Sequence, residues 1–184
     1  HDPPTTEIYT LGRSSAASDV YKRQVPTRLA VAINRDFKIP KDVKNHEVRA
    51  ECSIEEASYL YAITPHMHLV GETMSVTAQL PSGERIPLIR IDDWDFNWQT
   101  TYRCRDLQLL PAGTRIELVA TFDNSAENPN NPNSPPQEIV WGEKTTDEMC
   151  IAFLGLVRQS EYDPKLRGIK AEVNDPLAVK GSRE

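Results

Sequence analysis

The 184-residue chain lacks any apolar stretch near the length of about 20 residues that a membrane-spanning helix needs. It also lacks a run of lysine and arginine, and its formal net charge is -6 at pH 7. Nucleic acids and anionic membrane surfaces are bound through clustered basic side chains, so neither is the expected partner. A small molecule is favoured instead. Cysteine numbers only three, an odd count that excludes a fully paired set of internal disulfides.

Glycine is also scarce, at 8 residues, while proline numbers 14 and the hydrophobic share is 39%. This composition is typical of a loop-rich globular protein and not of a fibrous or disordered one. The length suffices for one well-buried domain and a tail, and is short for two domains. We therefore expect a single core.

The first residues are expected to lie outside that core. Residues 14–24 read SSAASDVYKRQ and resemble the in-frame translation of a transposase sequencing adapter, and residues 5–10, TTEIYT, resemble the end of a flow-cell oligonucleotide. We interpret residues 1–24 as a non-biological, disordered leader on a metagenomic gene fragment, with a genuine polar leader as the alternative. The domain is expected over residues 25–162, and residues 163–184 are expected to form a polar C-terminal tail.

From residue 25 onward, apolar residues recur with period two and no long helical stripe is present, which predicts an all-β domain. About eight short strands with turn residues between them favour a two-sheet antiparallel sandwich, jelly-roll-like or immunoglobulin-like. The loop NSAENPNNPNSPPQ, residues 124–137, is expected at the surface, and the sequence leaves its role open. The predicted strands are 28–34, 47–52, 58–64, 73–80, 85–91, 114–122, 138–141 and 149–158.

Two histidines at one strand end carry the first chemical signal. Residues two apart in a strand face the same way, so His66 and His68 would hold both imidazoles over one outward face, about 7 Å apart at the backbone, able to bind one ion. Pro65 favours an edge or irregular strand there. Such a pair also occurs by chance on surface strands, so the metal role is open on this evidence alone. The opposite, core-facing side is expected to hold Tyr59, Tyr61, Ile63, Met67 and Leu69.

A methionine supplies the third candidate ligand. Met149 opens the last apolar run, and a thioether favours Cu(I) while imidazole suits both copper oxidation states. A set of His66, His68 and Met149 would therefore select copper over zinc or magnesium. Alternation places Ile151 and Phe153 on the same face as Met149, where they would line an apolar floor beside the metal. The alternative is that Met149, Ile151 and Phe153 are all core packing.

Five motifs occur in a fixed order: TPHMHLVG (64–71), DFNWQTTY (95–102), AGTRI (112–116), DNSAENPNNP (123–132) and WGEKT (141–145), and DEMC closes the series. Together they resemble the C-terminal domain of the copper type II, ascorbate-dependent monooxygenases. This is the family of peptidylglycine- and dopamine β-hydroxylating enzymes, and the likeness is to a bacterial branch. The resemblance covers residues 39–162.

The resemblance implies a copper-dependent monooxygenase, an oxidoreductase that uses O2 and electrons from ascorbate or another reductant to hydroxylate a substrate C–H bond. It assigns His66, His68 and Met149 to the copper at which this reaction occurs. A second, electron-supplying copper would be held by histidines of a missing N-terminal domain. The resemblance also implies an extracytoplasmic location, periplasmic or secreted. A non-catalytic copper-binding or sensing module of the same fold is the alternative, and a degenerate sandwich kept for interaction is a third.

Departures from the family concern the substrate. Peptide-amidating members resemble one another in holding a substrate carboxylate with an Arg two residues before the histidine pair and with Asn and Tyr just after the DEM motif. The matching residues here are Thr64, Ile151 and Phe153, so no cation is present. A small, uncharged substrate is therefore expected in a pocket lined by these three residues.

The family also bears on the cysteines and on nearby acids. Cys52 and Cys150 fall where the family places disulfide cysteines, but their usual partners are not evident. A Cys104–Cys150 bridge and reduced, buried thiols are both open at this point. Four aspartates could support the site from outside its ligands, with turn or surface roles as the alternative. They are Asp93, Asp95, Asp123 and Asp147.

Overall fold

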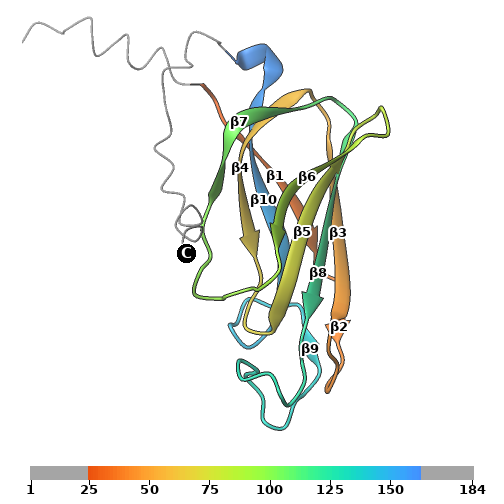
Figure 1. Ribbon diagram of the computed structural model, residues 1–184, viewed down its shortest axis with the longest axis vertical. Coiled ribbons are helices and arrows are strands. Elements are labelled where there is room, and N and C mark those ends of the chain that lie inside the picture. The colour runs from red at the N-terminus through yellow and green to blue at the C-terminus, as the bar shows by residue number, and fades with distance from the viewer. Residues whose placement is uncertain (1–24, 163–184) are drawn as a thin grey trace, which may run out of the picture.

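The computed structural model describes residues 25–162, which form an all-β domain (Figure 1). The predicted leader, residues 1–24, and the predicted tail, residues 163–184, lie outside the described residues. The strands are β1 (Arg28–Asn34), β2 (Lys38–Ile39), β3 (His46–Ile54), β4 (Ser58–His66), β5 (Gly71–Gln79), β6 (Arg85–Ile91), β7 (Tyr102–Leu110), β8 (Thr114–Phe122), β9 (Ile139–Val140) and β10 (Cys150–Arg158). A short 3-10 helix, η1 (Gln159–Glu161), follows the last strand.

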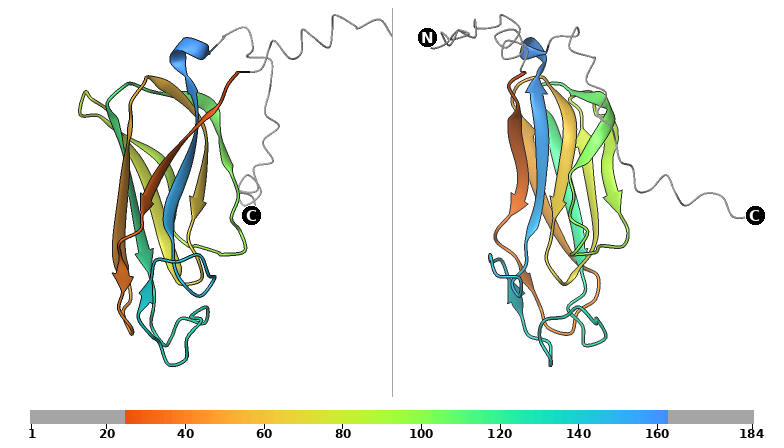
Figure 2. Two further views of the ribbon diagram at one scale, coloured as in Figure 1. Left: turned by 180° about the vertical axis from the view of Figure 1, so that it is seen from behind. Right: turned by 90° about the vertical axis from the view of Figure 1, so that its left-hand side faces the viewer.

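Two four-stranded sheets make up the domain. One has the order β1-β10-β4-β7, the other has the order β3-β8-β5-β6, and β2 pairs with β9 as a two-stranded extension. Every strand pair is antiparallel. The two large sheets face each other as layers (Figure 2). The predicted two-sheet, antiparallel, all-β sandwich is thus confirmed.

The core lies between these layers and follows from period-two alternation. In β8, alternate residues from Thr114 to Phe122 are buried and those between them are more exposed. Each large apolar side chain removed from water contributes about 1.5–3 kcal/mol. The residues that the two sheets bury completely in this cluster include Met74, Val76, Leu110, Ile116, Leu118, Phe122 and Leu154.

The sequence patterns located most strands but missed β7 and the two-residue strand β2. The bounds of β1, β6 and β8 agree with the predicted ones, whereas β7 (Tyr102–Leu110) was not predicted. Its sequence, YRCRDLQLL, lacks a clean alternation because β7 is an edge strand with most residues at least partly exposed. Its pairing with β4 is also irregular, so neither face repeats with period two.

A bulge in β4 corrects the predicted core face. Both neighbouring strands pair with Leu60 and Ala62 and skip Tyr61, so Tyr61 is an extra residue that shifts the alternation by one. Ile63 and Met67 do belong to the core, but Tyr59, Tyr61 and Leu69 are only half-buried and lie outside it. The prediction that all five share the core face is wrong for these three.

The three thiols are free. The alternative of a Cys104–Cys150 bridge fails because Cys104 lies in β7 and Cys150 in β10, with β4 between them. Two inter-strand spacings separate them by about 10 Å, beyond the Cα separation that a disulfide spans.

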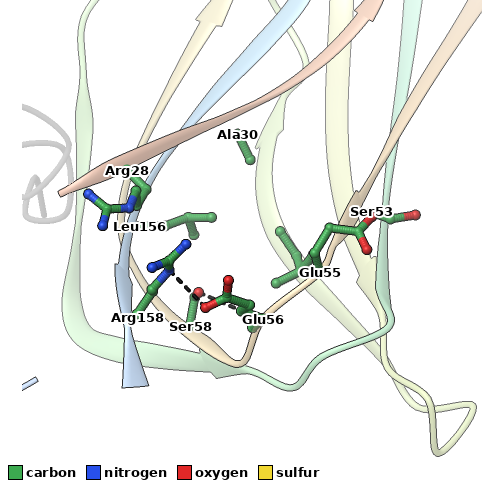
Figure 3. A pocket seen from close by; sticks show the side chains of 9 residues that line it. Arg28, Ala30, Ser53, Glu55, Glu56, Ser58, Leu156 and Arg158 are labelled. Atoms are coloured by element: carbon green, nitrogen blue, oxygen red, sulfur yellow. Dashed lines mark hydrogen bonds and ion pairs between the residues drawn. The ribbon is translucent and has the colours of Figure 1, made fainter. Parts of the chain in front are cut away.

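The two ends of the sandwich differ in chemistry. His66 ends β4 at the lower end in Figure 1, where β5 and β10 begin and where the connection from β6 to β7 passes. A pocket of about 170 Å³ lies at the other end, lined by Ala30 and Leu156 and by the ion pair of Arg158 with Glu56 (Figure 3). No helix within residues 25–162 has the length and hydrophobicity to cross a bilayer.

Candidate metal centre

The histidine pair lies where β4 ends. The ring centroids of His66 and His68 are 5.1 Å apart, and the ring planes are nearly perpendicular, at 85°. His66 is half-buried on the outer side of its sheet. His68 follows the end of the strand and is only 5% exposed. The prediction that both histidines face outward is wrong for His68 in one respect: its side chain is buried, because the strand ends at His66 and the ring of Phe96 packs against that of His68.

A glutamine from another part of the chain fixes the tautomer of His66. Nδ1 of His66 lies 2.5 Å from Oε1 of Gln99, and Nε2 of Gln99 donates to the carbonyl of Phe96 at 2.9 Å. The second bond orients the amide so that its oxygen faces the imidazole. An amide oxygen only accepts, so Nδ1 of His66 carries the proton and Nε2 keeps its lone pair.

The proton of His68 is also held on Nδ1, but by a different contact. Its Nδ1 lies 3.0 Å from the backbone carbonyl oxygen of Asp147, which can only accept. His68 therefore also holds its proton on Nδ1 and leaves Nε2 free. Two imidazoles whose free nitrogens are both Nε2, each oriented by an oxygen on the other ring nitrogen, match the usual support of metal-bound histidines.

Burial lowers the pKa of His66 below its ordinary value. The hydrogen bond with Gln99 opposes this shift, and the nearby His68 adds to it. The neutral imidazole is therefore favoured at neutral pH. This is the form that binds a metal ion.

The connection between β6 and β7, residues 92–101, contacts both histidines and holds them against the rest of the domain. Nε1 of the buried Trp94 donates to the carbonyl of His68 at 3.1 Å. The ring of Phe96 meets the ring of His68 edge-on, with centroids 6.1 Å apart. With Gln99 on His66, this one connection touches both imidazole-bearing residues.

Gly71, the last residue of the motif TPHMHLVG, is required because residues 92–101 approach it closely. A Cβ on Gly71 would lie 2.9 Å from Cδ1 of Trp94 and 3.0 Å from Cβ of Met67. Neither neighbour has room to retreat, because both side chains are buried in the core. Gly71 thus permits the close approach of residues 92–101 to the turn after β4.

Met149 is brought to the same region by its neighbour in the sequence. Oε2 of Glu148 accepts the backbone N–H of His68 at 2.8 Å and that of Met149 at 2.9 Å. The two backbone nitrogens therefore flank a single oxygen atom. Within the described residues, no third His, Cys, Asp or Glu side chain joins the histidine pair in a cluster able to hold a metal ion.

The residues predicted to line a substrate pocket lie beside His66. In the register of β4 with β10, His66 is opposite Ile151 and Thr64 is opposite Phe153. Directly opposite residues of an antiparallel pair share a face. Ile151 is 5% exposed and Phe153 is half-buried. Neither belongs to the core between the sheets, since both are on the outer face.

The chain matches a known protein family over most of its length. The family described as the copper type II ascorbate-dependent monooxygenase, C-terminal domain, matches residues 27–164. The chain belongs to this family. Copper is therefore its metal, and ascorbate is the family's reductant.

The other comparisons add little to this assignment. No curated protein matches the chain. One solved structure with some likeness, "Structure of infectious bursal disease virus Gx strain", is 11% identical over 74% of this chain, with a TM-score of 0.33. The matched part is about a third of that chain, 34% of its length. A TM-score this low supports no inference about fold or function.

The residues at the site suit the metal of the copper monooxygenases. Imidazole is a ligand for copper in both oxidation states, and the thioether of Met149 is a soft donor for Cu(I). The orientation of both imidazoles is fixed without any metal, by oxygen acceptors on Nδ1. Preorganised nitrogen donors of this kind fit a bound copper ion.

Sequence reasoning missed the residues that orient the two histidines and Met149. Gln99 and Trp94 lie about 30 residues from the histidines along the chain, and Glu148 lies 80 residues from His68. The motif DFNWQTTY contains Gln99, and DEMC contains Glu148, but no spacing rule links them to the histidines. Of the four aspartates considered, Asp147 does contact the site, through its backbone carbonyl and not its carboxylate.

Proposed function

We propose that this domain is the substrate-hydroxylating half of a copper monooxygenase, and that His66, His68 and Met149 together hold its single copper ion. When bound, copper would supply the redox chemistry with O2 by which a substrate C–H bond is hydroxylated. The observation that carries the proposal is the shared tautomer of His66 and His68, because it leaves both Nε2 atoms free.

The position of Met149 supports its role as the third ligand. Its backbone nitrogen and that of His68 bind the same carboxylate oxygen, so the two residues are neighbours although 81 positions apart. Met149 is also only partly buried and does not belong to the core, unlike Met67 and Met74. A methionine outside the core, whose backbone nitrogen shares one carboxylate oxygen with that of His68, could offer its thioether to Cu(I).

The substrate is proposed to be small and uncharged. Two rows of residues cross three strands beside the histidine: Ile33, Ile151 and His66 form one row, and Val31, Phe153 and Thr64 form the next. No residue of either row carries a fixed charge. A substrate carboxylate would find no cation in these rows, whereas an apolar group would find isoleucine, valine and phenylalanine.

A partner domain and a compartment complete the proposal. The family's chemistry needs electrons from ascorbate, and we propose that a second copper domain, N-terminal to this one in the complete enzyme, delivers them. We also propose an extracytoplasmic location, because copper chemistry of this family belongs to oxidising compartments.

Copper titration of the purified 184-residue chain tests the ligand set. Cu(II) is titrated in air and Cu(I) is titrated under anaerobic conditions with ascorbate. We expect Met149→Leu to weaken Cu(I) binding by about tenfold or more while leaving Cu(II) binding nearly unchanged. His66→Ala should lose both ions, because two remaining donors hold a mononuclear site poorly.

Met74→Leu is the matched control, because Met74 is fully buried in the core and the exchange nearly conserves volume. Its copper binding should equal that of the parent. If Met149→Leu binds Cu(I) as tightly as the parent while His66→Ala does not bind it, Met149 is not a ligand. Catalysis is separated from simple copper binding by recovering the upstream coding sequence and measuring ascorbate-driven O2 consumption. A complete chain that binds copper but consumes no O2 would instead favour a binding or sensing module.

A further inference from the structure

A buried carboxylate lies between the two ligand-bearing segments. Glu148 is 0% exposed, and no ion pair within residues 25–162 includes it. An isolated buried carboxylate is costly unless hydrogen bonds satisfy it. Its presence here therefore needs a structural explanation.

Backbone N–H groups supply that explanation. Oε2 accepts from His68 at 2.8 Å and from Met149 at 2.9 Å, and Oε1 accepts from Val70 at 2.9 Å. A fourth N–H, that of Gly71, also acts on this carboxylate. All these partners are donors, so both oxygens accept. Burial raises the pKa of Glu148 to about 7, and the backbone N–H groups oppose that shift because they favour the ionised form.

No other side chain at this position could make the same set of bonds. A glutamine has one accepting oxygen and one NH2 group, and the NH2 group would face an N–H of the backbone. In one amide orientation it would face His68 and Met149, and in the other it would face Val70. An aspartate would keep both oxygens and the charge, but it is one methylene shorter and could not reach both segments.

The carboxylate continues the link between β4 and β10 beyond the end of their ladder, where His66 lies opposite Ile151. The turn after β4 carries His68, and the segment before β10 carries Met149. The backbone of Glu148 is itself held by β9, since its N–H donates to the carbonyl of Val140 at 3.1 Å. The other direct bond between the segments runs from Nδ1 of His68 to the carbonyl of Asp147. Oε2 of Glu148 alone binds both ligand residues.

We propose that Glu148 is a positioning residue of the copper centre, whose carboxylate sets the backbone of Met149 against the histidine pair and so places the thioether at the metal. This inference rests on the proposed function, because it takes His66, His68 and Met149 as the ligands. Glu148 does not itself bind the metal, since both of its oxygens are occupied by N–H groups.

The experiment compares Glu148→Gln and Glu148→Asp with the parent 184-residue chain. Cu(I) and Cu(II) affinities are measured by competition titration, and X-ray absorption of the Cu(I) form reports whether sulfur is bound. We expect both variants to lose Cu(I) affinity by about 10- to 100-fold. The sulfur signal should weaken, while the imidazole signal and most of the Cu(II) affinity are kept.

Two controls separate positioning from general destabilisation. Glu117→Gln makes the same acid-to-amide change on β8, where the carboxylate is held by Arg85 and Arg115. Ile116→Val weakens the core without touching the site, since Ile116 is fully buried in the opposite sheet. Both controls should keep the sulfur signal of the parent even where their thermal stability falls.

The outcomes are distinct for the two proposals. If the parent binds copper without a sulfur ligand, the proposed ligand set fails and so does this inference. If the parent shows sulfur and Glu148→Gln shows it equally, with equal Cu(I) affinity, Glu148 does not position the thioether. If only Glu148→Gln is impaired and Glu148→Asp matches the parent, the charge and not the reach is what matters, and the inference is again wrong.

Hydrogen exchange of the parent chain tests the inference even if neither variant folds. The backbone N–H groups of His68, Val70 and Met149 should exchange with deuterium slowly in the metal-free chain, as a unit, because one buried carboxylate binds them. Fast exchange of the Met149 amide relative to the other two would show that Glu148 does not hold it, and would overturn the inference.

Discussion

Replacing the buried Asn124 with alanine should destabilise the end of the domain that carries the proposed copper site. Asn124 is 0% exposed and begins the long polar loop between β8 and β9. Its Nδ2 donates to the carbonyl of Pro40 at 2.9 Å and to that of Gln137 at 2.7 Å. Its Oδ1 accepts from Nδ2 of Asn131 at 2.9 Å. One side chain thus joins both ends of the loop to the chain before β3.

The magnitude follows from these three bonds. Each contributes about 1 kcal/mol net, and a buried carbonyl left without a donor costs about 1–3 kcal/mol more. We therefore expect Asn124→Ala to lower the free energy of unfolding by about 3–5 kcal/mol, which corresponds to a fall in Tm of about 10 °C or more for a domain of this size. Asn124→Asp should be worse, because an oxygen would then face two carbonyl oxygens.

Guanidinium denaturation followed by tryptophan fluorescence and circular dichroism measures this change. The control is Asn130→Ala, since Asn130 is exposed in the same loop and its replacement should stay within about 0.5 kcal/mol of the parent. The copper affinity of Asn124→Ala should also fall, because Gln137 leads into β9, whose Val140 binds the backbone of Glu148. A loss of stability below about 1 kcal/mol for Asn124→Ala would refute the reasoning.

Three further predictions concern the support of the site and the thiols. Gln99→Ala should lower copper affinity in equilibrium dialysis by about 10- to 100-fold, whereas Gln108→Ala, at the far end of β7, should leave it unchanged; equal affinities would contradict the role of Gln99. Gly142→Ala should cost about 1–3 kcal/mol in thermal denaturation, because the added Cβ would overlap the side chain of Asp147; a stable variant would show that the turn can relax. Burial raises the pKa of Cys52 to about 11, so only about a thousandth of this thiol is ionised at pH 8 and it should react slowly with iodoacetamide until guanidinium exposes all three thiols. Fewer than three reactive thiols in guanidinium would contradict the free-thiol structure.

Local sequence was sufficient for most of the fold. The bounds of β1, β6 and β8 could be predicted from alternation, because each packs one face on the core and leaves the other more exposed. Alternation failed in β4, where the extra residue Tyr61 changes which side faces the core. It failed again at β7, an edge strand with no regular buried face. Neither the place of this bulge nor the edge position of β7 could be predicted from the alternation of the residues nearby.

For the candidate site, too, some features could be predicted from the sequence and others could not. The types of donor, two imidazoles at one strand end and a thioether just before another, could be predicted from the sequence, because ligand preference depends on side-chain type. Which ring nitrogens are free could not be predicted, since Gln99 and Asp147 fix the tautomers from distant parts of the chain. Only the tertiary structure decided that His68 is buried and that Glu148 joins His68 to Met149. Hydrogen bonds depend on distances of about 3 Å between atoms, and sequence separation does not set those distances.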